Sequence, residues 1–292
     1  MTMTKGLRAS AWRSARRLAR LPGTIALLGG AVLVWGGLVE PRRVRVRRAR
    51  LRLSGWPERL DGLRLALVSD FHAGGPHARE GRLKRVVARV NREAPDVVLL
   101  LGDYVDPAIP GVEPLDPGRV AAALGELRAP LGVLAVLGNH DWANDGDRVA
   151  AALRSVGIRV LENEAVALEV SRARLWVAGL ADLRTREPQV DRTLPAPDDD
   201  APILLLTHDP DVFPVVPERV TLTLAGHLHG GQIDVPGLRQ IVVPSRFGMR
   251  YAAGHVEEAG RHLYVSRGVG TSGLPLRLRA PAGFEMLELF AR

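Results

Sequence analysis

The sequence of 292 residues contains no cysteine. Disulfide bonds, thiolate metal sites and cysteine nucleophiles are therefore excluded. A cysteine-free chain fits an oxidising compartment as well as a reducing one, so this absence indicates no location. The chain also has no internal repeat and no long low-complexity stretch. Hydrophobic residues make up 46% of it, which is enough for a buried core, and its length suits one large α/β domain.

The formal net charge of +8 is spread unevenly. Residues 1–60 carry 14 Lys and Arg but only two Asp and Glu, so the remaining residues together carry −4. The excess positive charge flanks a single apolar segment, which is typical of a protein at a membrane surface. Binding to a nucleic-acid backbone needs many basic contacts on the folded domain, so we expect no nucleic-acid partner.

The apolar segment runs from Leu21 to Val39 without a charge, close to the ~20 residues needed to cross a bilayer. The basic residues before it are typical of a cytoplasmic flank. No small-residue cleavage site follows the run, which favours an uncleaved anchor over a removed signal peptide. The sequence therefore predicts a basic cytoplasmic N-terminus (1–20), a single-pass membrane anchor (21–39) and a folded domain (40–292) on the extracytoplasmic side.

Residues 42–52 are as basic as the upstream flank, which weakens the charge argument for this orientation. Val44, Val46, Leu51 and Leu53 alternate with arginines there. We interpret this segment as the first strand of the domain, with one buried face and its arginines toward solvent or lipid headgroups.

From residue 63 onward, short apolar strands repeatedly end in polar residues. The five strands and the residues that follow them are 63–68 before Ser69-Asp70-Phe71-His72, 97–101 before Gly102-Asp103-Tyr104-Val105-Asp106, 133–137 before Gly138-Asn139-His140-Asp141, 203–206 before Thr207-His208-Asp209, and 221–225 before Gly226-His227-Leu228-His229. In α/β sheets the ligand site lies beyond the carboxyl ends of the strands, so these tips are expected to converge on one crevice.

Segments whose apolar residues have helical spacing lie between some of these strands. One contains Leu83, Val86, Val87 and Val90, and another contains Val149, Leu153 and Val156. This βαβ order predicts an α/β sandwich. After residue 160 strands dominate, at 166–170, 175–178, 240–243 and 263–266, which predicts a second, more antiparallel sheet. The segments 107–118 and 195–202 are predicted to be surface loops.

Five of the eight histidines stand at the strand tips. Taken alone, an aspartate at a strand end is usually a turn former and a single histidine is usually a surface group. Five loops would each need the same coincidence, so the combined pattern indicates a metal site built from nitrogen and oxygen ligands, which suit Mn, Fe or Zn.

The ordered blocks Asp70-x-His72, Gly102-Asp103, Gly138-Asn139-His140-Asp141, His208 and Gly226-His227-x-His229 resemble those of the calcineurin-like metallophosphoesterases over residues 63 to about 290. The resemblance implies a four-layer α/β/β/α sandwich, here preceded by one transmembrane helix. It also implies two divalent metal ions. Their expected ligands are Asp70, His72, Asp103 and His229 for one ion, and Asp103, Asn139, His208 and His227 for the other.

In this family Asp103 would bridge the two ions, and a water or hydroxide between them would attack the phosphorus. His140 is not needed as a ligand, so it is expected to protonate the leaving oxygen or to bind the phosphate. The segment 102–106 is also similar to that of the serine/threonine phosphatases, in which the second aspartate orients this histidine; Asp106 would do so here. Pro107 stands where those phosphatases carry a phosphate-binding arginine, which argues against a protein-phosphatase role.

The C-terminal blocks Gly230-Gly231-Gln232, Arg250-Tyr251-x-x-Gly254 and 266–271 resemble the YaeI/YkuE-like phosphodiesterases. Arg267 within the last block would either contact substrate phosphate or pair with a backbone carbonyl. The sequence thus predicts a membrane-tethered hydrolase of small-molecule or lipid phosphodiesters or phosphomonoesters.

Three other functions are compatible with parts of this sequence. The first is a pyrophosphatase that cleaves a lipid-linked nucleotide, such as a UDP-sugar-lipid, at the bilayer surface. The second is a metal-free binding scaffold, which is disfavoured because every ligand position matches. The third is a nuclease, which the acidic domain argues against.

Overall fold

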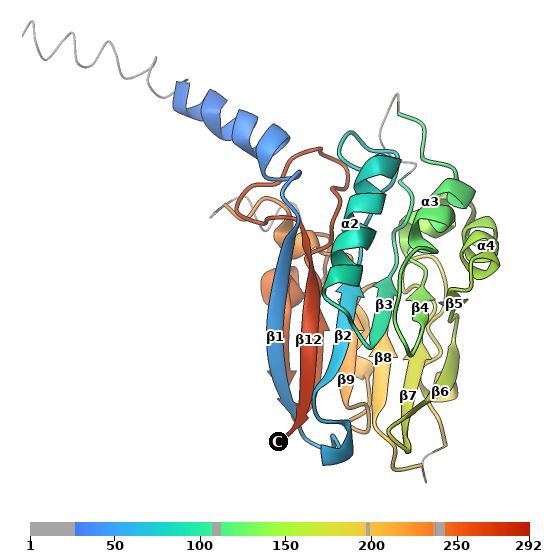
Figure 1. The fold of residues 1–292 in the computed structure, drawn as a ribbon. Coiled ribbons are helices and arrows are strands. Elements are labelled where there is room, and N and C mark those ends of the chain that lie inside the picture. Colours follow the sequence, from blue (N-terminus) through green and yellow to red (C-terminus); the bar gives the residue numbers. More distant parts are fainter. Residues whose placement is uncertain (1–26, 107–111, 197–198, 236, 238–242) are drawn as a thin grey trace, which may run out of the picture.

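Two six-stranded sheets pack face to face in the computed structural model, which describes residues 27–106, 112–196, 199–235, 237 and 243–292 (Figure 1). The first sheet has the order β1-β12-β2-β3-β4-β5 and the second β10-β11-β9-β8-β7-β6. The strands of the first sheet are β1 (Arg45–Leu53), β2 (Leu63–Val68), β3 (Val97–Leu101), β4 (Val133–Val136), β5 (Arg159–Val160) and β12 (Gly283–Ala291). Those of the second are β6 (Glu164–Val170), β7 (Ala173–Gly179), β8 (Ile203–Leu206), β9 (Leu222–Ala225), β10 (Gly254–Glu258) and β11 (Arg261–Val265).

Helices cover the outer faces of the two sheets. Three of them, α2 (Glu80–Arg92), α3 (Pro117–Leu124) and α4 (Asn139–Ser155), lie over the first sheet (Figure 1). The described part of the chain places only short helices on the second sheet, among them α5 (Val190–Thr193), η3 (Pro210–Val215) and η5 (Gly248–Tyr251). Two further single turns are η2 (Glu58–Leu60) and η4 (His229–Gly231). Two mixed sheets with flanking helices fit the predicted α/β sandwich, with a thin fourth layer.

Period-two alternation along the strands divides the core between the layers. In β2, Leu65 and Leu67 face the second sheet, whereas Ala66 and Val68 face the helices. The strands β2, β3 and β4 are mutually parallel. The second sheet contains two antiparallel pairs, β6 with β7 and β10 with β11, against one in the first sheet. The prediction of a more antiparallel second sheet is therefore confirmed.

Strand β1 differs from its prediction because its buried face changes along its length. Val44 and Val46 pack toward the helical layer, but Leu51 and Leu53 pack between the sheets. These two pairs differ in parity along the strand, so one face cannot carry all four residues. At this edge of the sheet β1 pairs only with β12, and the helices cover only its first part. Most of its arginines are exposed, as predicted.

One predicted surface loop needs revision, and one predicted strand lies mostly outside the described residues. Residues 107–111 lie outside the described residues, but the predicted loop 107–118 ends in α3, which begins at Pro117. Asp116 caps that helix by accepting a hydrogen bond from the Gly118 amide, and proline at the first helical position fits because its missing N–H is not needed there. The predicted strand 240–243 lies outside the described residues except for Val243, which is not in a strand.

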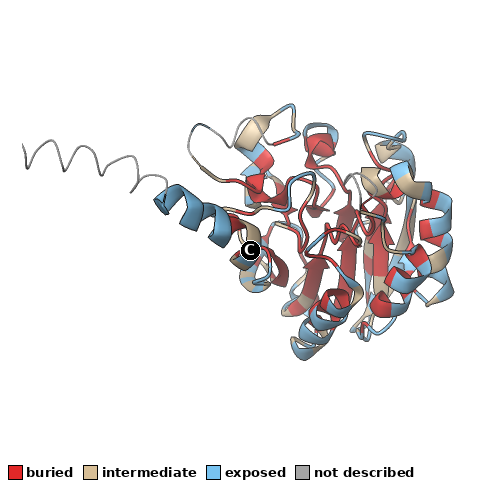
Figure 2. Cartoon of the chain, turned by 90° about the horizontal axis from the view of Figure 1, so that it is seen from above, coloured by how far each residue is buried: buried red, intermediate tan, exposed pale blue. Residues whose placement is uncertain are grey.

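The described part of the apolar N-terminal segment, residues 27–39, projects from one end of the sandwich (Figures 1 and 2). A helix over residues 27–34 continues as the π-helical turn η1 (Trp35–Val39), and its apolar side chains are largely exposed, Leu27 by 77%. The first part of the predicted anchor, residues 21–26, lies outside the described residues. Within the described residues no helix is long and apolar enough to cross a membrane.

Candidate metal centre

The five predicted strand tips meet at one end of the sandwich. Aspartate and histidine side chains at these tips form three groups whose potential ligand atoms all lie within 4.8 Å of one another in each group. The groups are Asp70 with His72 and His229, His72 with Asp103 and His140, and Asp103 with His208 and His227. These groups share His72 and Asp103, so they form one continuous cluster.

The backbone at this cluster is unusual. Five residues of the cluster have left-handed backbone angles: Asp70 (φ 55°), His72 (φ 46°), Asp103 (φ 57°), His227 (φ 70°) and His229 (φ 52°). A non-glycine residue held in this region costs about 1–3 kcal/mol, and such residues concentrate at functional sites. These backbone angles turn the chain sharply at the end of each strand, so that several ligand side chains converge.

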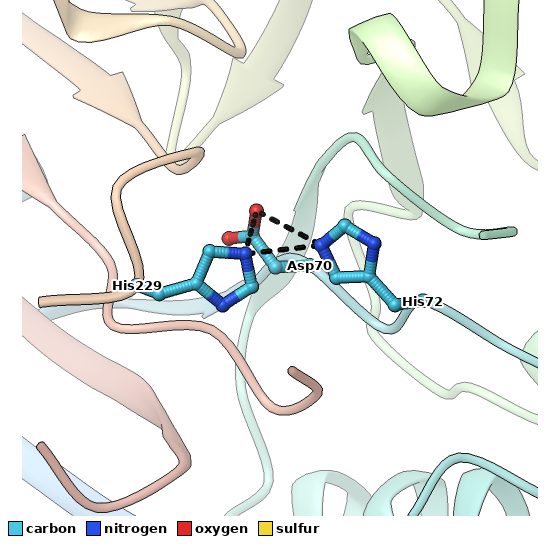
Figure 3. A group of neighbouring side chains, drawn as sticks. All are labelled: Asp70, His72 and His229. Atoms are coloured by element: carbon cyan, nitrogen blue, oxygen red, sulfur yellow. Dashed lines mark hydrogen bonds and ion pairs between the residues drawn. The ribbon is translucent and has the colours of Figure 1, made fainter. Parts of the chain in front are cut away.

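The first half of the cluster consists of Asp70, His72 and His229 (Figure 3). His72 Nε2 lies 3.0 Å from His229 Nε2, and Asp70 Oδ1 lies 3.4 Å from His229 Nε2. All three residues are at most 5% exposed. Three donor atoms that face one another in a buried space are the arrangement expected around one cation.

Asp103 connects this half to the second. Its Oδ2 lies 3.6 Å from His72 Nε2 and 3.1 Å from His208 Nε2. His208 Nε2 in turn lies 3.1 Å from His227 Nδ1. A single carboxylate thus faces imidazoles of both halves.

The side-chain oxygen of Asn139 indicates that this cluster fits a metal ion. Asn139 is the first residue of α4 and lines the same cleft as Asp103 and His227. Its Oδ1 is buried and accepts no hydrogen bond from any described residue. A buried carbonyl oxygen without a partner is costly, and a hard or borderline cation would satisfy it. The donor set of imidazole, carboxylate and amide oxygens therefore fits divalent metal ions.

His140 lies beside the aspartate and histidine cluster and lines the cleft that opens over it. Its Nδ1 lies 3.3 Å from Asp106 Oδ1 and its Nε2 lies 3.4 Å from Ser272 Oγ. The ring meets His72 edge-on, with a centroid distance of 4.9 Å. Its own backbone amide donates to Asp103 Oδ1 at 3.0 Å. The expected pair of His140 with Asp106 is therefore present in the structure.

Burial shifts the pKa values of the histidines and aspartates in the cluster. It lowers the pKa of His72 to about 4 and lowers the pKa values of His227 and His229 well below the usual range, so these imidazoles are neutral at pH 7 and offer lone pairs. Burial raises the pKa of Asp70 to about 6. Burial opposes charge on Asp103 and His208 too, but their mutual attraction outweighs it, lowering the pKa of Asp103 and raising that of His208.

Two local features hold Asp103 in position. The buried Asp141 carboxylate accepts hydrogen bonds from the backbone amides of Asp103, Tyr104 and Gly138 at 2.8–2.9 Å. It therefore ties the β3 tip to the start of α4. Gly102 has φ +91°, and a Cβ there would lie 2.7 Å from both Gly138 N and His208 Nδ1. We did not predict a role for Asp141; its position three residues after the helix N-cap is the sequence signal that could have indicated one.

Arg277 supports the other side of the cluster. It is fully buried, and one guanidinium nitrogen lies 3.0 Å from His229 Nδ1. The same side chain donates to the backbone carbonyls of Gly270, Ala280 and Arg267. His229 is thereby held with its Nε2 toward Asp70 and His72.

A cleft of about 460 Å³ opens over the cluster. Its lining includes Arg184, which sequence reasoning missed because this residue belongs to a loop far from every motif. Arg184 Nε donates to Asp209 Oδ2 at 2.8 Å, and its side chain is 36% exposed. Arg267, the predicted phosphate contact, is not among the described lining residues of the cleft; its carbonyl accepts from Arg277.

Comparisons with known proteins agree with this geometry. Residues 63–231 match the model of the calcineurin-like phosphoesterase family. The metallophosphoesterase YkuE of Bacillus subtilis is 32% identical over 87% of this chain and 90% of that protein. Phosphodiesterase YaeI of Escherichia coli is 33% identical over 68% and 71% of the two chains. A transmembrane protein with a metallophosphoesterase domain from Danio rerio is 31% identical over 87% of this chain and 59% of that protein.

The chain belongs to the calcineurin-like phosphoesterase family. It is therefore a metal-dependent phosphoester hydrolase. The predicted similarity to the YaeI and YkuE proteins is confirmed.

Proposed function

We propose that this protein is a membrane-tethered phosphoesterase with two metal ions, in which Asp103 is the bridging ligand. The observation that carries the proposal is the position of the Asp103 carboxylate between His72 and His208. Asp70, His72 and His229 complete one site, and Asn139, His208 and His227 complete the other. Mn, Fe or Zn suit these ligands.

Two divalent ions at these positions would supply the Lewis acidity that activates the attacking water and neutralises the phosphoryl oxygens. The chain's own residues would do the rest. His140 would donate a proton from Nε2, which faces the cleft, to the leaving oxygen. Asp106 would orient the ring through Nδ1 and stabilise its charged form, and Arg184 would bind a phosphoryl oxygen.

A hydrolysis screen tests this function. Purified full-length protein, loaded with Mn, would be assayed on phosphomonoesters, phosphodiesters and lipid-linked pyrophosphates while its metal content is measured by elemental analysis. We expect two ions per chain and metal-dependent hydrolysis of at least one ester class. Two bound ions without any hydrolysis would favour a binding role, and at most one tightly bound ion would contradict the two-metal proposal.

One observation favours a lipid phosphoester or lipid-linked nucleotide as the substrate. The segment that carries Ser272 and Leu274 lines the cleft, and the same segment reaches the base of the apolar helix, where the Arg277 amide donates to the Gly36 carbonyl at 2.9 Å. Leu274 is 56% exposed. A substrate with its lipid tail in the bilayer would therefore have a short path to the metal cluster.

Replacing Arg184 by glutamine should raise KM about tenfold or more without loss of metal, because a charge-assisted hydrogen bond to phosphate contributes about 1.5–3 kcal/mol. The matched variant Arg267→Gln removes the same charge outside the described cleft lining and should leave KM nearly unchanged. Steady-state kinetics and elemental analysis measure both effects. A KM that rises in Arg267→Gln but not in Arg184→Gln would assign phosphate binding to Arg267.

Metal affinity should fall as the pH is lowered through about 6. Below its raised pKa of about 6, Asp70 is protonated and must lose that proton before it can bind an ion. His208, whose pKa is raised, must lose a proton too, so both groups change the affinity in the same direction. Calorimetric Mn titrations in buffers of different ionisation enthalpy would count the released protons. An affinity that is independent of pH, with no proton release, would contradict this expectation.

The full-length protein should remain in the membrane fraction after high-salt and carbonate washes. The exposed apolar side chains of residues 27–39 continue the run that begins at Leu21, and together they match a bilayer span. The variant Leu28→Arg/Leu33→Arg should move to the soluble fraction, because both side chains are exposed and can be changed without disturbing the domain. A soluble wild-type product that begins after residue 39 would identify a cleaved signal instead.

The side of the membrane can be tested separately. The chain has no cysteine, so the variant Arg159→Cys introduces a single thiol at an exposed position of the domain. We expect an impermeant maleimide to label this variant in intact cells, in agreement with an extracytoplasmic domain. Labelling only after lysis would place the domain in the cytoplasm.

A further inference from the structure

A second cavity, a groove of about 610 Å³, lies between α2 and the segment that leads from the apolar helix into β1. Half of its twelve described lining residues are arginines, and none of these twelve is an aspartate or glutamate. The six arginines are Arg42, Arg79, Arg82, Arg85, Arg89 and Arg92. We refer to this site as the arginine groove.

The positive charge of the arginine groove is not neutralised within the described part of the chain. All of these arginines except Arg82 are exposed, and none of the exposed ones forms an ion pair with a described residue. The two acidic residues of this helix region pair elsewhere: Glu80 with Lys84 and Arg119, and Glu93 with Arg48. Like charges gathered without counter-charges repel one another, and an anionic ligand would relieve this repulsion.

Arg82 fixes the groove to the start of the domain. It is 7% exposed and donates to the carbonyls of Pro41 and Val269. Pro41 comes directly after Glu40, the C-cap of the apolar helix, so α2 is tied to the point where that helix enters the domain. The groove therefore has a defined position relative to the helix.

The residues at this junction have the features of a membrane interface. Trp35 is 43% exposed, and the Arg43 guanidinium lies 5.0 Å from the centre of its ring. Tryptophan and arginine are typical of the headgroup level, where an apolar segment meets water. The exposed apolar side chains end at Leu38 and the groove begins at Arg42, so the groove would lie at headgroup depth.

We propose that the arginine groove binds the headgroup phosphates of anionic phospholipids and thereby seats α2 on the bilayer. This proposal rests on the proposed membrane attachment, but it assigns a binding site outside the metal cleft. The twelve residues known to line the groove include no Phe, Tyr or Trp on which bases could stack, which disfavours single-stranded nucleic acid as the ligand.

The experiment uses full-length protein in neutral-detergent micelles that contain phosphatidylcholine and phosphatidylglycerol in a known ratio. The lipid that copurifies is measured by mass spectrometry. The lipid that copurifies with wild-type protein should contain a larger fraction of phosphatidylglycerol than the micelles do, and added salt should reduce this enrichment. The variant Arg79→Gln/Arg85→Gln should lose up to about twenty-five-fold of the binding preference, since each arginine near an anionic surface contributes about fivefold.

Neither Arg79 nor Arg85 donates a side-chain hydrogen bond to a described residue, so this variant should fold and hydrolyse a soluble ester at the wild-type rate. The control Arg159→Gln/Arg192→Gln makes the same charge change at exposed positions outside the groove and should keep the enrichment. Equal enrichment in both double variants, or none in wild type, would overturn the proposal. Tighter binding of a short RNA that displaces the lipid would also overturn it, in favour of a nucleic-acid surface.

Carbonate extraction of the membranes from which each protein is purified, together with hydrolysis of a soluble ester by the purified protein, separates the two proposals. A protein that stays in membranes and remains active but shows no lipid preference disproves only the arginine-groove proposal. A protein that is extracted by carbonate yet enriches phosphatidylglycerol disproves the anchor and supports the groove.

Discussion

Asp103→Asn should leave the protein unable to hold two metal ions. It should also reduce hydrolytic activity by about 10³-fold, because Lewis-acid stabilisation by a metal contributes several kcal/mol and about 1.4 kcal/mol corresponds to tenfold in rate. The Asp103 side chain is 1% exposed, and its Oδ2 faces imidazoles of both halves of the cluster. Burial alone would raise its pKa, but the field of His208 and the hydrogen bond to it lower the pKa well below the usual value, so the group is anionic at neutral pH. An amide in its place removes the negative charge between the two sites.

Elemental analysis after gel filtration measures this effect directly, without relying on activity. Asp211→Asn is the matched control, because Asp211 is 5% exposed and bonds Ser245 and the Arg246 amide instead of the cluster. It should retain both ions. Two tightly held ions in the Asp103→Asn protein would show that the bridging assignment is wrong.

Much of this cluster could be predicted because parallel strands carry their C-terminal residues to one edge of a sheet. The residues after β2, β3, β4, β8 and β9 meet for that reason, although they come from both sheets. Local sequence also indicated α2 and most of the strands, since the buried positions follow the period of each element.

Other features depend on long-range packing that no local pattern shows. Arg184 reaches the cleft only because the loop after β7 folds back and Asp209 holds its side chain. The change of buried face in β1 depends on β12, which joins the sheet between β1 and β2 from the other end of the chain. The left-handed angles at Asp70 and His72 are also unreadable from residue type, because aspartate and histidine usually adopt other conformations.

The start of α3 is a different case, because the sequence carries a local signal for it that the loop prediction did not take into account. Asp116 followed by Pro117 is an N-cap followed by proline at the first helical position, which predicts a helix start. The surrounding prolines and glycines led instead to the prediction of a loop. Here two local patterns competed, and capping decided the outcome.

His140→Ala should retain both metal ions and lose about 10²–10⁴-fold in activity on substrates with poor leaving groups. His140 is the one histidine of the cluster that faces both Asp106 and the cleft. Burial lowers its pKa, but the hydrogen bond to Asp106 and the charge of Asp103 outweigh burial, and the net pKa is raised. A raised pKa extends to higher pH the range in which the ring is protonated, as a general acid requires, and activity should fall as the pH rises through that pKa.

The leaving group separates proton donation from binding. An ester with a good leaving group needs no protonation, so its hydrolysis should be much less sensitive to His140→Ala. Asp106→Asn should give a milder loss with the same dependence on the leaving group, because Asp106 reaches the leaving oxygen through the His140 ring. His255→Ala is the matched control, since that histidine stacks on His262 away from the strand tips. Equal losses for good and poor leaving groups would assign His140 to phosphate binding, whereas loss of an ion in His140→Ala would make it a metal ligand.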